Sequence, residues 1–414
     1  MPSTRRPVIV DDSGPSLRAT LGKPAREGNG RARITSRNSI LNDTRPAPAS
    51  HNAEWIDTRD GLEKWLSGVD GQLAVDTEFM RRNTYHAQLA LVQLAHDDRH
   101  ALVDPLAAPI GDALARMDAG QSPLWIMHSP SEDLGVLAPL LPQGPRRLFD
   151  TQLAAAFCGM GLGISYRALV EAVTGEQLDK GETRSDWMRR PLTAAQRLYA
   201  TLDVVHLHAV HQHLDRALRE RDRMAWFEHD CERLKQRACG RNGDDQPQQA
   251  LRGAASWPSE RQALLRRVLL WRETTAIAID KPRPWLLQDA QVMSLVDQPP
   301  ASGNELTTRT QGQRALRGQQ RQQLLDVLQR PVDPDEIAAT APIPAGLDSA
   351  GRRILSGMKH EVDRLAQALD LPAGLLAPRK MLELYIATRE WPDALDGWRR
   401  EILEQRLSAC LPGA

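Results

Sequence analysis

Three short apolar segments lie close together in the first third of the chain and are separated by polar, turn-forming residues. They cover residues 72–79, 89–95 and 100–104. Runs of this length bounded by turns are typical of β-strands, and their close spacing favours adjacent strands joined by hairpins. From about residue 105 to 215, helical patterns alternate with short buried runs. This order predicts an α/β domain built on a mixed sheet.

The pattern after Leu214 is almost entirely helical and contains a short internal repeat. Ala278-Ile-Asp-Lys-Pro282 recurs as Ala368-Leu-Asp-Leu-Pro372, and each copy is followed shortly by a Leu-Leu pair. Amphipathic helical stripes lie on both sides of the repeat. A repeat with so long a period indicates two tandem helical modules and not a solenoid.

The junctions between these domains follow from local composition. Residues 1–50 are rich in Pro, Gly, Ser and Arg and show no sustained periodicity, which predicts a disordered basic tail. The polar stretch beginning at Gly240 contains further Gly and Pro and is typical of a linker. We therefore expect a tail over residues 1–50, the α/β domain over 51–240, and helical modules over 250–335 and 340–414.

The composition bounds the class of protein. The chain has 414 residues, 41% of them hydrophobic and 26% charged, which is enough for about two or three globular domains. No run reaches the ~18–20 apolar residues that a membrane span needs, and the polar N-terminus does not resemble a secretory signal. A net charge of zero argues against bulk electrostatic coating of nucleic acid. We expect a cytoplasmic protein without membrane association.

Two carboxylates end the first apolar run. Asp76 and Glu78 are separated by one residue, and residues i and i+2 of a strand project from the same face. Like charges held side by side are unfavourable unless protons or cations neutralise them, so the pair suggests a site for a hard metal ion with oxygen ligands. Taken alone, the pair fits a solvated strand end better, because such strings are frequent.

Further candidate residues follow later in the chain. Asp133 falls in the first turn of a helix that Ser129 or Ser131 could cap. Tyr199 and Asp203 have the i, i+4 spacing that places a phenol and a carboxylate on one helical face. Together with the first pair they make a set of four carboxylates and one tyrosine.

In this order, Asp76-x-Glu78, Asp133 and Tyr199-x-x-x-Asp203 resemble the motifs of the DEDD 3′→5′ exonucleases of the tyrosine subtype. The resemblance narrows to the ribonuclease D family through the segments 75–85, 149–158, 178–180 and 183–192. The helical region is similar, more loosely, to the paired HRDC modules of that family. That similarity rests on Trp271-Arg-Glu, Asp280-x-Pro282, Ala377-Pro-Arg379 and Gly397-Trp-Arg-Arg-Glu401.

The resemblance implies an α/β nuclease domain with a ribonuclease H-like mixed sheet flanked by helices, followed by two all-α HRDC-like modules. It also implies two divalent cations, Mg²⁺ or Mn²⁺, which prefer oxygen ligands. Asp76 would bridge both cations, and Asp133 would hold the second one. Glu78 and Asp203 would complete the site that activates a water. Tyr199 would orient that water, because a phenol with a pKa of about 10 is a poor base at neutral pH.

The implied activity is that of a 3′→5′ exoribonuclease that releases nucleoside 5′-monophosphates from RNA with a free 3′ end. The resemblance further implies tRNA precursors as substrates, and we expect a monomer. A DNA exonuclease of the Werner or proofreading type would use the same chemistry, and only a contact to the ribose 2′-OH separates the two. A non-catalytic RNA-binding scaffold is a third hypothesis, against which the presence of all five functional residue types weighs.

Basic residues also suggest RNA contacts. Basic side chains interleaved with a tryptophan can hold phosphates and stack a base, but a helix surface with a buried tryptophan explains them equally well. In the helical modules, exposed arginines without an acidic cluster predict a role in positioning substrate. The first group is Arg184, Trp187, Arg189, Arg190 and Arg197, and the second is Arg266, Arg267, Arg272, Arg399 and Arg400.

Two remaining features receive structural interpretations. Asp150 is expected to cap the helix that begins at Thr151. Histidines at 206, 208, 211 and 213 could hold a transition metal. No acidic general base lies between them, so exposed helix positions are the better explanation.

Overall fold

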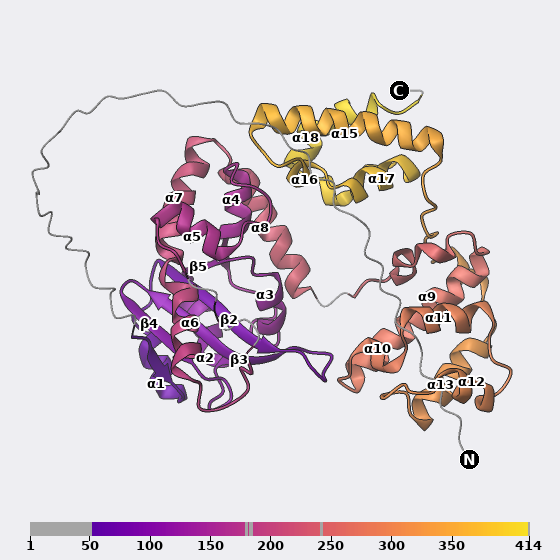
Figure 1. Cartoon of the computed structure of the whole chain (residues 1–414), viewed down its shortest axis with the longest axis horizontal. Coiled ribbons are helices and arrows are strands. Elements are labelled where there is room, and N and C mark those ends of the chain that lie inside the picture. The colour runs from indigo at the N-terminus through magenta and orange to yellow at the C-terminus, as the bar shows by residue number, and fades with distance from the viewer. Residues whose placement is uncertain (1–51, 179–180, 182–184, 241–242, 413–414) are drawn as a thin grey trace, which may run out of the picture. The chain divides into compact units, whose positions relative to one another are not determined.

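A mixed sheet forms the centre of the N-terminal domain (Figure 1), in a computed structural model that describes residues 52–178, 181, 185–240 and 243–412. The predicted tail over 1–50 lies outside these residues. Six strands run through the described part in the order β1-β4-β3-β2-β5-β6. The strands are β1 (Glu54–Ile56), β2 (Gln72–Met80), β3 (Gln88–His96), β4 (Arg99–Val103), β5 (Leu124–Met127) and β6 (Arg147–Asp150).

The sequence prediction for the first strands is confirmed. β2, β3 and β4 are consecutive and antiparallel, as expected for hairpin-connected strands. β1 pairs with β4, β2 with β5 and β5 with β6 in parallel, so the sheet is mixed. Helices cover it on both faces, which confirms the α/β class of this domain. They are α1 (Arg59–Leu66), α2 (Gly111–Gly120), α3 (Ser131–Leu137), α4 (Thr151–Phe157), α5 (Tyr166–Thr174), α6 (Ala194–Val205), α7 (Leu207–Glu220) and α8 (Met224–Cys239).

The two faces of the sheet have separate cores. On one face, α1 begins at its Thr58 cap and buries Leu62 and Trp65 with side chains from α2 and α3. On the other face, α6 packs across β2, β3 and β4. This second core contains Leu91 and Leu102, which the alternation of strand side chains directs to the same side.

The pairing of β2 leaves its second half accessible from one edge. β5 pairs only with Gln72–Ala74, so β2 continues beyond the end of its neighbour. α3 follows the end of β5 and packs against β2 and β3 at this point. Asp76 and Glu78 therefore lie where the sheet, α3 and α6 meet.

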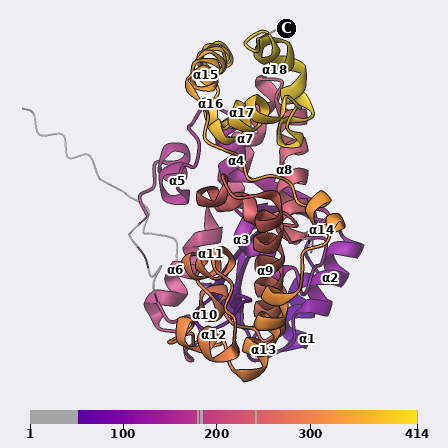
Figure 2. The ribbon, with the colours of Figure 1, turned by 90° about the vertical axis from the view of Figure 1, so that its right-hand side faces the viewer.

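The described residues after α8 form helices joined by loops and contain no strand, as predicted. The first group of helices comprises α9 (Ser259–Ala278), α10 (Arg283–Leu286), α11 (Asp289–Asp297), α12 (Gly303–Arg309), α13 (Gly318–Gln329) and α14 (Pro334–Ala338). The second comprises α15 (Ser349–Leu369), α16 (Ala373–Leu376), α17 (Arg379–Thr388) and α18 (Trp398–Ser408). α15 contacts α16, α17 and α18, and the four helices lie together at the top of Figure 2. No helix in the described part of the chain is both long and apolar enough to cross a bilayer.

The internal repeat has the same local structure in both copies. α9 and α15 each end just before an aspartate, Asp280 or Asp370, with a φ of 48°. Aspartate tolerates this left-handed conformation better than most residues, and the helix ends there. A short helix, α10 or α16, follows in each copy. The repeated Asp-x-Pro string thus encodes a helix end and the turn after it.

The second helical group shares a core with the N-terminal domain. Asp230 of α8 accepts hydrogen bonds from both terminal nitrogens of Arg399, at 2.7 and 2.5 Å, and one from the Trp398 indole at 3.2 Å. Trp226 stacks on Trp398 with ring centroids 4.5 Å apart. A chain cut after α8 would therefore expose apolar surface and leave a buried carboxylate unpaired.

Candidate active site

Asp76 and Glu78 occupy one face of β2, as their spacing predicts. Both side chains are half-buried, and Thr77 between them is buried on the opposite face. The register of the β2–β3 pair shifts between Glu78 and Phe79, so the regular ladder ends directly after the second carboxylate. The strand thus places two carboxylates side by side at its irregular end.

Asp133 reaches the same region from α3. The helix begins after Pro130 without a side-chain cap, so the predicted cap from Ser129 or Ser131 is wrong. Ser129 instead adopts a φ of 55°, and its backbone N–H donates to Asp150. Asp133 does lie in the first turn, is only 9% exposed, and accepts a 2.5 Å hydrogen bond from the Thr77 hydroxyl.

Tyr199 and Asp203 come from α6. This helix starts with a capping box between Thr193 and Gln196, which fixes its beginning five residues before Tyr199. Tyr199 and Asp203 lie one helical turn apart on α6, and each shifts the pKa of the other, as expected from their i, i+4 spacing. On the other side of the ring, Gly181 approaches so closely that a Cβ there would lie 1.7 Å from Tyr199 Cδ2. Position 181 therefore requires glycine while Tyr199 keeps this position.

The carboxyl groups share a strong electrostatic field. Burial, followed by the charges of Asp203 and Asp133, raises the pKa of Glu78 to about 8. Burial also raises the pKa of Asp203 to about 7, and the hydrogen bond from Tyr199 offsets only part of that effect. The pKa of Asp133 rises to about 6 because burial outweighs the hydrogen bond from Thr77.

Asp76 lies at the centre of this field. Burial raises its pKa well above the usual range, and the charges of Asp133, Asp203 and Glu78 raise it further. The pKa of Tyr199 is also raised, by burial and then by Asp203 and Glu78. Tyr199 is therefore a neutral hydrogen-bond donor at physiological pH.

The donor set fits a hard divalent cation. The four carboxylates supply only oxygen ligands, and a bound cation would remove the repulsion that raises the pKa values of Asp76, Glu78 and Asp203. As the side chains lie, no group of three or more His, Cys, Asp or Glu in the described part of the chain is placed to hold a metal ion. A bound cation would therefore have to draw the carboxylate oxygens closer together.

The residues predicted to contact RNA have different surroundings in the structure: some are buried or paired, and others are exposed. Arg184 lies outside the described residues. Trp187 is 2% exposed and packs on the Tyr199 ring at 6.0 Å, so it supports the tyrosine and is not available to stack a base in this conformation. Arg190 binds both oxygens of Asp104, at 2.6 and 2.7 Å, which favours a structural role.

Arg189 and Arg197 remain exposed and can meet a phosphate. Arg197 also lies over the Trp55 ring, 5.3 Å from its centroid. The expectation of exposed arginines in the helical region is wrong for Arg267 and Arg399, which are buried in ion pairs with Glu336 and Asp230. These buried pairs hold the modules together and leave fewer side chains for RNA.

The structural interpretation of Asp150 is confirmed, because its side chain accepts hydrogen bonds from the Gln152 and Leu153 backbones. The histidine cluster differs from the expectation. His206 and His211 are buried, and only His213 is exposed. Burial lowers the pKa of His211 to about 4, so this residue is neutral and belongs to the core.

Sequence reasoning missed one tyrosine beside the carboxylates. The Tyr166 hydroxyl donates to the Leu202 carbonyl at 3.2 Å and so holds the α6 backbone next to Asp203. Its pKa is raised by burial and then by the charges of Asp203 and Asp76. No spacing rule connects α5 with α6 in the sequence, so Tyr166 carries no signal of its own.

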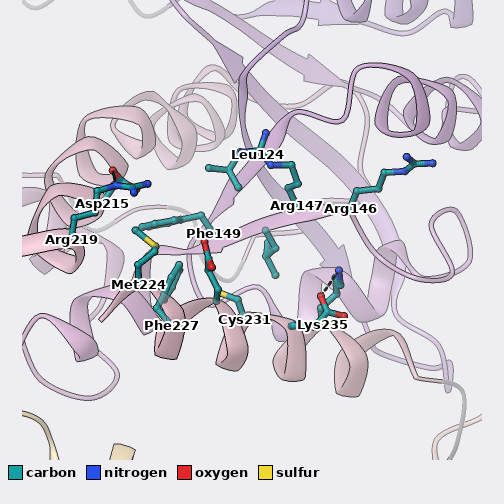
Figure 3. Close-up of a pocket in the computed structure, with 13 residues that line it drawn as sticks. Leu124, Arg146, Arg147, Phe149, Asp215, Arg219, Met224, Phe227, Cys231 and Lys235 are labelled. Atoms are coloured by element: carbon teal, nitrogen blue, oxygen red, sulfur yellow. Dashed lines mark hydrogen bonds and ion pairs between the residues drawn. The ribbon is translucent and has the colours of Figure 1, made fainter. Parts of the chain in front are cut away.

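A separate pocket of about 240 Å³ lies at the beginnings of β5 and β6 (Figure 3). Phe149, Met224 and Phe227 form its apolar wall. Its charged side chains include internal pairs, Lys235 with Glu232 and Arg219 with Asp215. Asp133 follows the opposite end of β5, so this pocket is not part of the carboxylate site.

Comparisons with known proteins agree with this geometry. Residues 53–219 match the 3′-5′ exonuclease family. A ribonuclease D of Xanthomonas oryzae pv. oryzae is 39% identical over 358 residues, which cover 86% of this chain and 98% of the relative. The chain belongs to the ribonuclease D family. A ribonuclease D of Shewanella sp. strain ANA-3 is 32% identical over 81% of this chain and 88% of that relative.

The structural similarity to a solved ribonuclease D includes the helical region as well as the nuclease domain. The crystal structure of Escherichia coli RNase D, described as an exoribonuclease involved in structured RNA processing, matches 87% of this chain and 98% of its own. The TM-score is 0.75 at 25% sequence identity. The chain is thus a hydrolytic 3′→5′ exoribonuclease of the DEDD class, a class that is generally metal-dependent.

Proposed function

We propose that this ribonuclease D shortens structured RNAs, tRNA precursors among them, from their 3′ ends and releases nucleoside 5′-monophosphates. The observation that carries the proposal is the convergence of four carboxylates with raised pKa values and one neutral tyrosine. The Escherichia coli relative with the same overall fold supports the choice of structured RNA. We further propose that the enzyme works in the cytoplasm as a monomer.

Two divalent cations, Mg²⁺ or Mn²⁺, would supply a nucleophilic hydroxide at neutral pH and compensate charge on the attacking and leaving oxygens. Asp76 would bind both cations, since the charges of Asp133, Asp203 and Glu78 all act on it. Glu78 and Asp203 would bind on the side of the attacking water, and Asp133 on the side of the leaving group. Binding lowers the effective pKa of these groups, so they work ionised.

Tyr199 would hold the water and not remove its proton. Its raised pKa keeps the phenol protonated, so the hydroxyl can donate or share a hydrogen bond but is a poor base. Trp187 and Gly181 fix the ring from outside the site. The tyrosine is thereby pre-oriented, which reduces the ordering needed during each reaction cycle.

Products from the full-length protein test the reaction directly. A 5′-labelled RNA should yield a ladder that shortens from the 3′ end in Mg²⁺, and EDTA should stop it. The released material should comigrate with nucleoside 5′-monophosphates. Internal cleavage or 3′-monophosphate products would contradict the assignment.

The choice of RNA over DNA has its own measurement, because a contact to the ribose 2′-OH is what separates the two substrates. Competing RNA and DNA strands of one sequence, labelled with different dyes, should show faster loss of the RNA. Faster loss of DNA would favour the alternative of a DNA exonuclease. Binding without loss of either strand would favour the scaffold alternative.

A cleft next to the carboxylate strand supports binding of a longer RNA. It measures about 950 Å³, and its lining includes Arg81, Arg82, Tyr85, Arg272, Arg283 and Trp285 together with the acids Asp244, Glu273 and Asp289. Arg272 and Arg283 are paired with Asp289 and Glu273, so Arg81 and Arg82 are the basic side chains of the cleft that are left for phosphates. Arg81 and Arg82 directly follow β2, the strand that carries Asp76 and Glu78. An RNA whose 3′ end reaches the carboxylates can therefore leave its upstream phosphates near these arginines.

Replacing Arg81 and Arg82 by alanine in the full chain tests this path. Affinity for a structured RNA should fall, and the slope of log K against log salt should decrease by about one per arginine. Cleavage of a very short strand should change less. The exposed Arg364 of α15, which pairs with Glu361, provides a matched control, and its alanine variant should keep the wild-type salt slope.

A further inference from the structure

Gln93 in the middle of β3 is an unusual side chain for its position. It is fully buried, with 0% exposure, and among the residues that the structure describes neither its amide nitrogen nor its amide oxygen has a hydrogen-bond partner. A buried polar group without a partner destabilises the folded state, and most buried side-chain polar atoms in folded proteins are paired. Packing alone therefore does not explain a glutamine here, because an apolar side chain of similar length would fill the space without that cost.

The register of the sheet shows what Gln93 faces. Gln93 is the direct cross-strand partner of Asp76 in the antiparallel β2–β3 pair, and such partners project from the same face. On its other side, Gln93 is opposite Leu102 of β4, which has no polar side-chain atom. Of the two side chains directly across from Gln93, the Asp76 carboxylate is thus the one that can accept a hydrogen bond.

We propose that Gln93 is a positioning residue, whose amide nitrogen donates a hydrogen bond to the Asp76 carboxylate when that group binds cations. The proposal rests on the metal site of the proposed function. α6 and α3 both pack against β2, the strand that carries Asp76. To present oxygens to two cations, the Asp76 carboxylate would need a fixed orientation. A donor held rigidly in the neighbouring strand supplies that orientation, as groups behind metal ligands commonly do.

Gln93→Met tests the proposal, because methionine keeps the length of the side chain and removes both polar atoms. We expect Mn²⁺, titrated calorimetrically into the full-length protein without RNA, to bind about 10–100-fold more weakly to the variant. The melting temperature in EDTA should not fall, because the substitution also removes an unpaired buried amide. Gln93→Leu provides a second apolar variant if the methionine protein does not fold.

Gln248→Met is the matched control. Gln248 is also a fully buried glutamine, but it lies before α9 and donates to the Ala341 carbonyl at 2.7 Å. Its substitution should lower the melting temperature and leave Mn²⁺ affinity unchanged. A second comparison uses Asp76→Asn: if Gln93 acts through Asp76, adding Gln93→Met to that variant should weaken Mn²⁺ binding no further.

Three results would overturn the proposal. Mn²⁺ affinity within about twofold of wild type in Gln93→Met would show that the amide does not position a ligand. An equal loss from Gln93→Met in the wild-type and Asp76→Asn backgrounds would show that Gln93 does not act through Asp76. Failure of the wild-type protein itself to bind Mn²⁺ would remove the metal site of the proposed function, and with it the proposal.

Discussion

The Thr77 hydroxyl donates a 2.5 Å hydrogen bond to the Asp133 carboxylate and so connects the central strand β2 with helix α3. Thr77 lies between Asp76 and Glu78 but faces the opposite side of the strand. One tripeptide therefore supplies two candidate ligands directly and orients a third. This relationship links the positions of three carboxylates to one segment of backbone.

Replacing Thr77 by valine should lower activity about 10-fold or more, because it removes this orienting hydrogen bond while keeping the shape of the side chain. Thr77→Ser keeps the hydroxyl and should retain most of the activity. Initial rates on a 5′-labelled RNA at saturating Mg²⁺ would show the difference. Equal rates for the valine and serine variants would mean that Asp133 is held by other contacts.

Tyr199→Phe should lower the single-turnover rate by about 10²–10⁴-fold, the range for a positioned hydrogen-bonding group. Mn²⁺ affinity should change little, since the hydroxyl is not proposed as a ligand. The pH–rate profile should keep its shape and lose height. An ionisation that disappears in the phenylalanine variant would instead identify the phenol as a base, and an unchanged rate would leave it a packing residue.

The metal-free protein should lose stability as pH rises. The folded-state pKa values of Asp133, Asp203 and Glu78 are raised to about 6, 7 and 8, whereas unfolded carboxyl groups have values near 4. Folding therefore takes up protons, and the stability present below about pH 4 is lost as these groups ionise up to about pH 8. Thermal melts in EDTA between pH 5 and 8.5 would show this trend.

Mg²⁺ or Mn²⁺ should remove much of that pH dependence, because a bound cation stabilises the ionised carboxylates. Asp203→Asn should flatten the EDTA curve by removing one titrating group. A melting temperature in EDTA that rises steadily over the same pH range would contradict the raised pKa values.

Asp230→Asn should destabilise the protein by about 3–5 kcal/mol, because it leaves the buried guanidinium of Arg399 without its counter-charge. Asp396→Asn is the control. Asp396 pairs with Arg400 at 3.6 Å on the surface, where loss of one partner costs about 1 kcal/mol or less. Urea unfolding of the two variants, compared with wild type, measures the difference.

Sequence patterns predicted the chemistry of the site better than its surroundings. Strand alternation placed Asp76 and Glu78 on one face, and helical spacing paired Tyr199 with Asp203. Both pairs are close in sequence, so the geometry of a single strand or helix determines where their side chains lie. Asp133 was correctly placed in a first helical turn, but the cap was not, because the choice between a serine cap and a proline start depends on the turn after β5.

Relations between distant segments were not predictable in this way. Trp187 and Arg190 belong to one basic stretch, yet tertiary contacts bury the first and pair the second with Asp104. The role assigned to Gln93 depends on strand register, which hydrophobic runs alone do not determine. Tyr166 becomes a neighbour of Asp203 only through the packing of α5 on the rest of the domain.

The central claim is that Asp76 and its neighbouring carboxylates hold the metal ions for exonucleolytic cleavage. Single-turnover cleavage of a 5′-labelled RNA by full-length wild type and Asp76→Asn, each in Mg²⁺, tests it most directly. We predict that the variant folds, binds the RNA with near wild-type affinity and leaves the labelled strand uncut. Cleavage by Asp76→Asn within about tenfold of the wild-type rate would contradict the account.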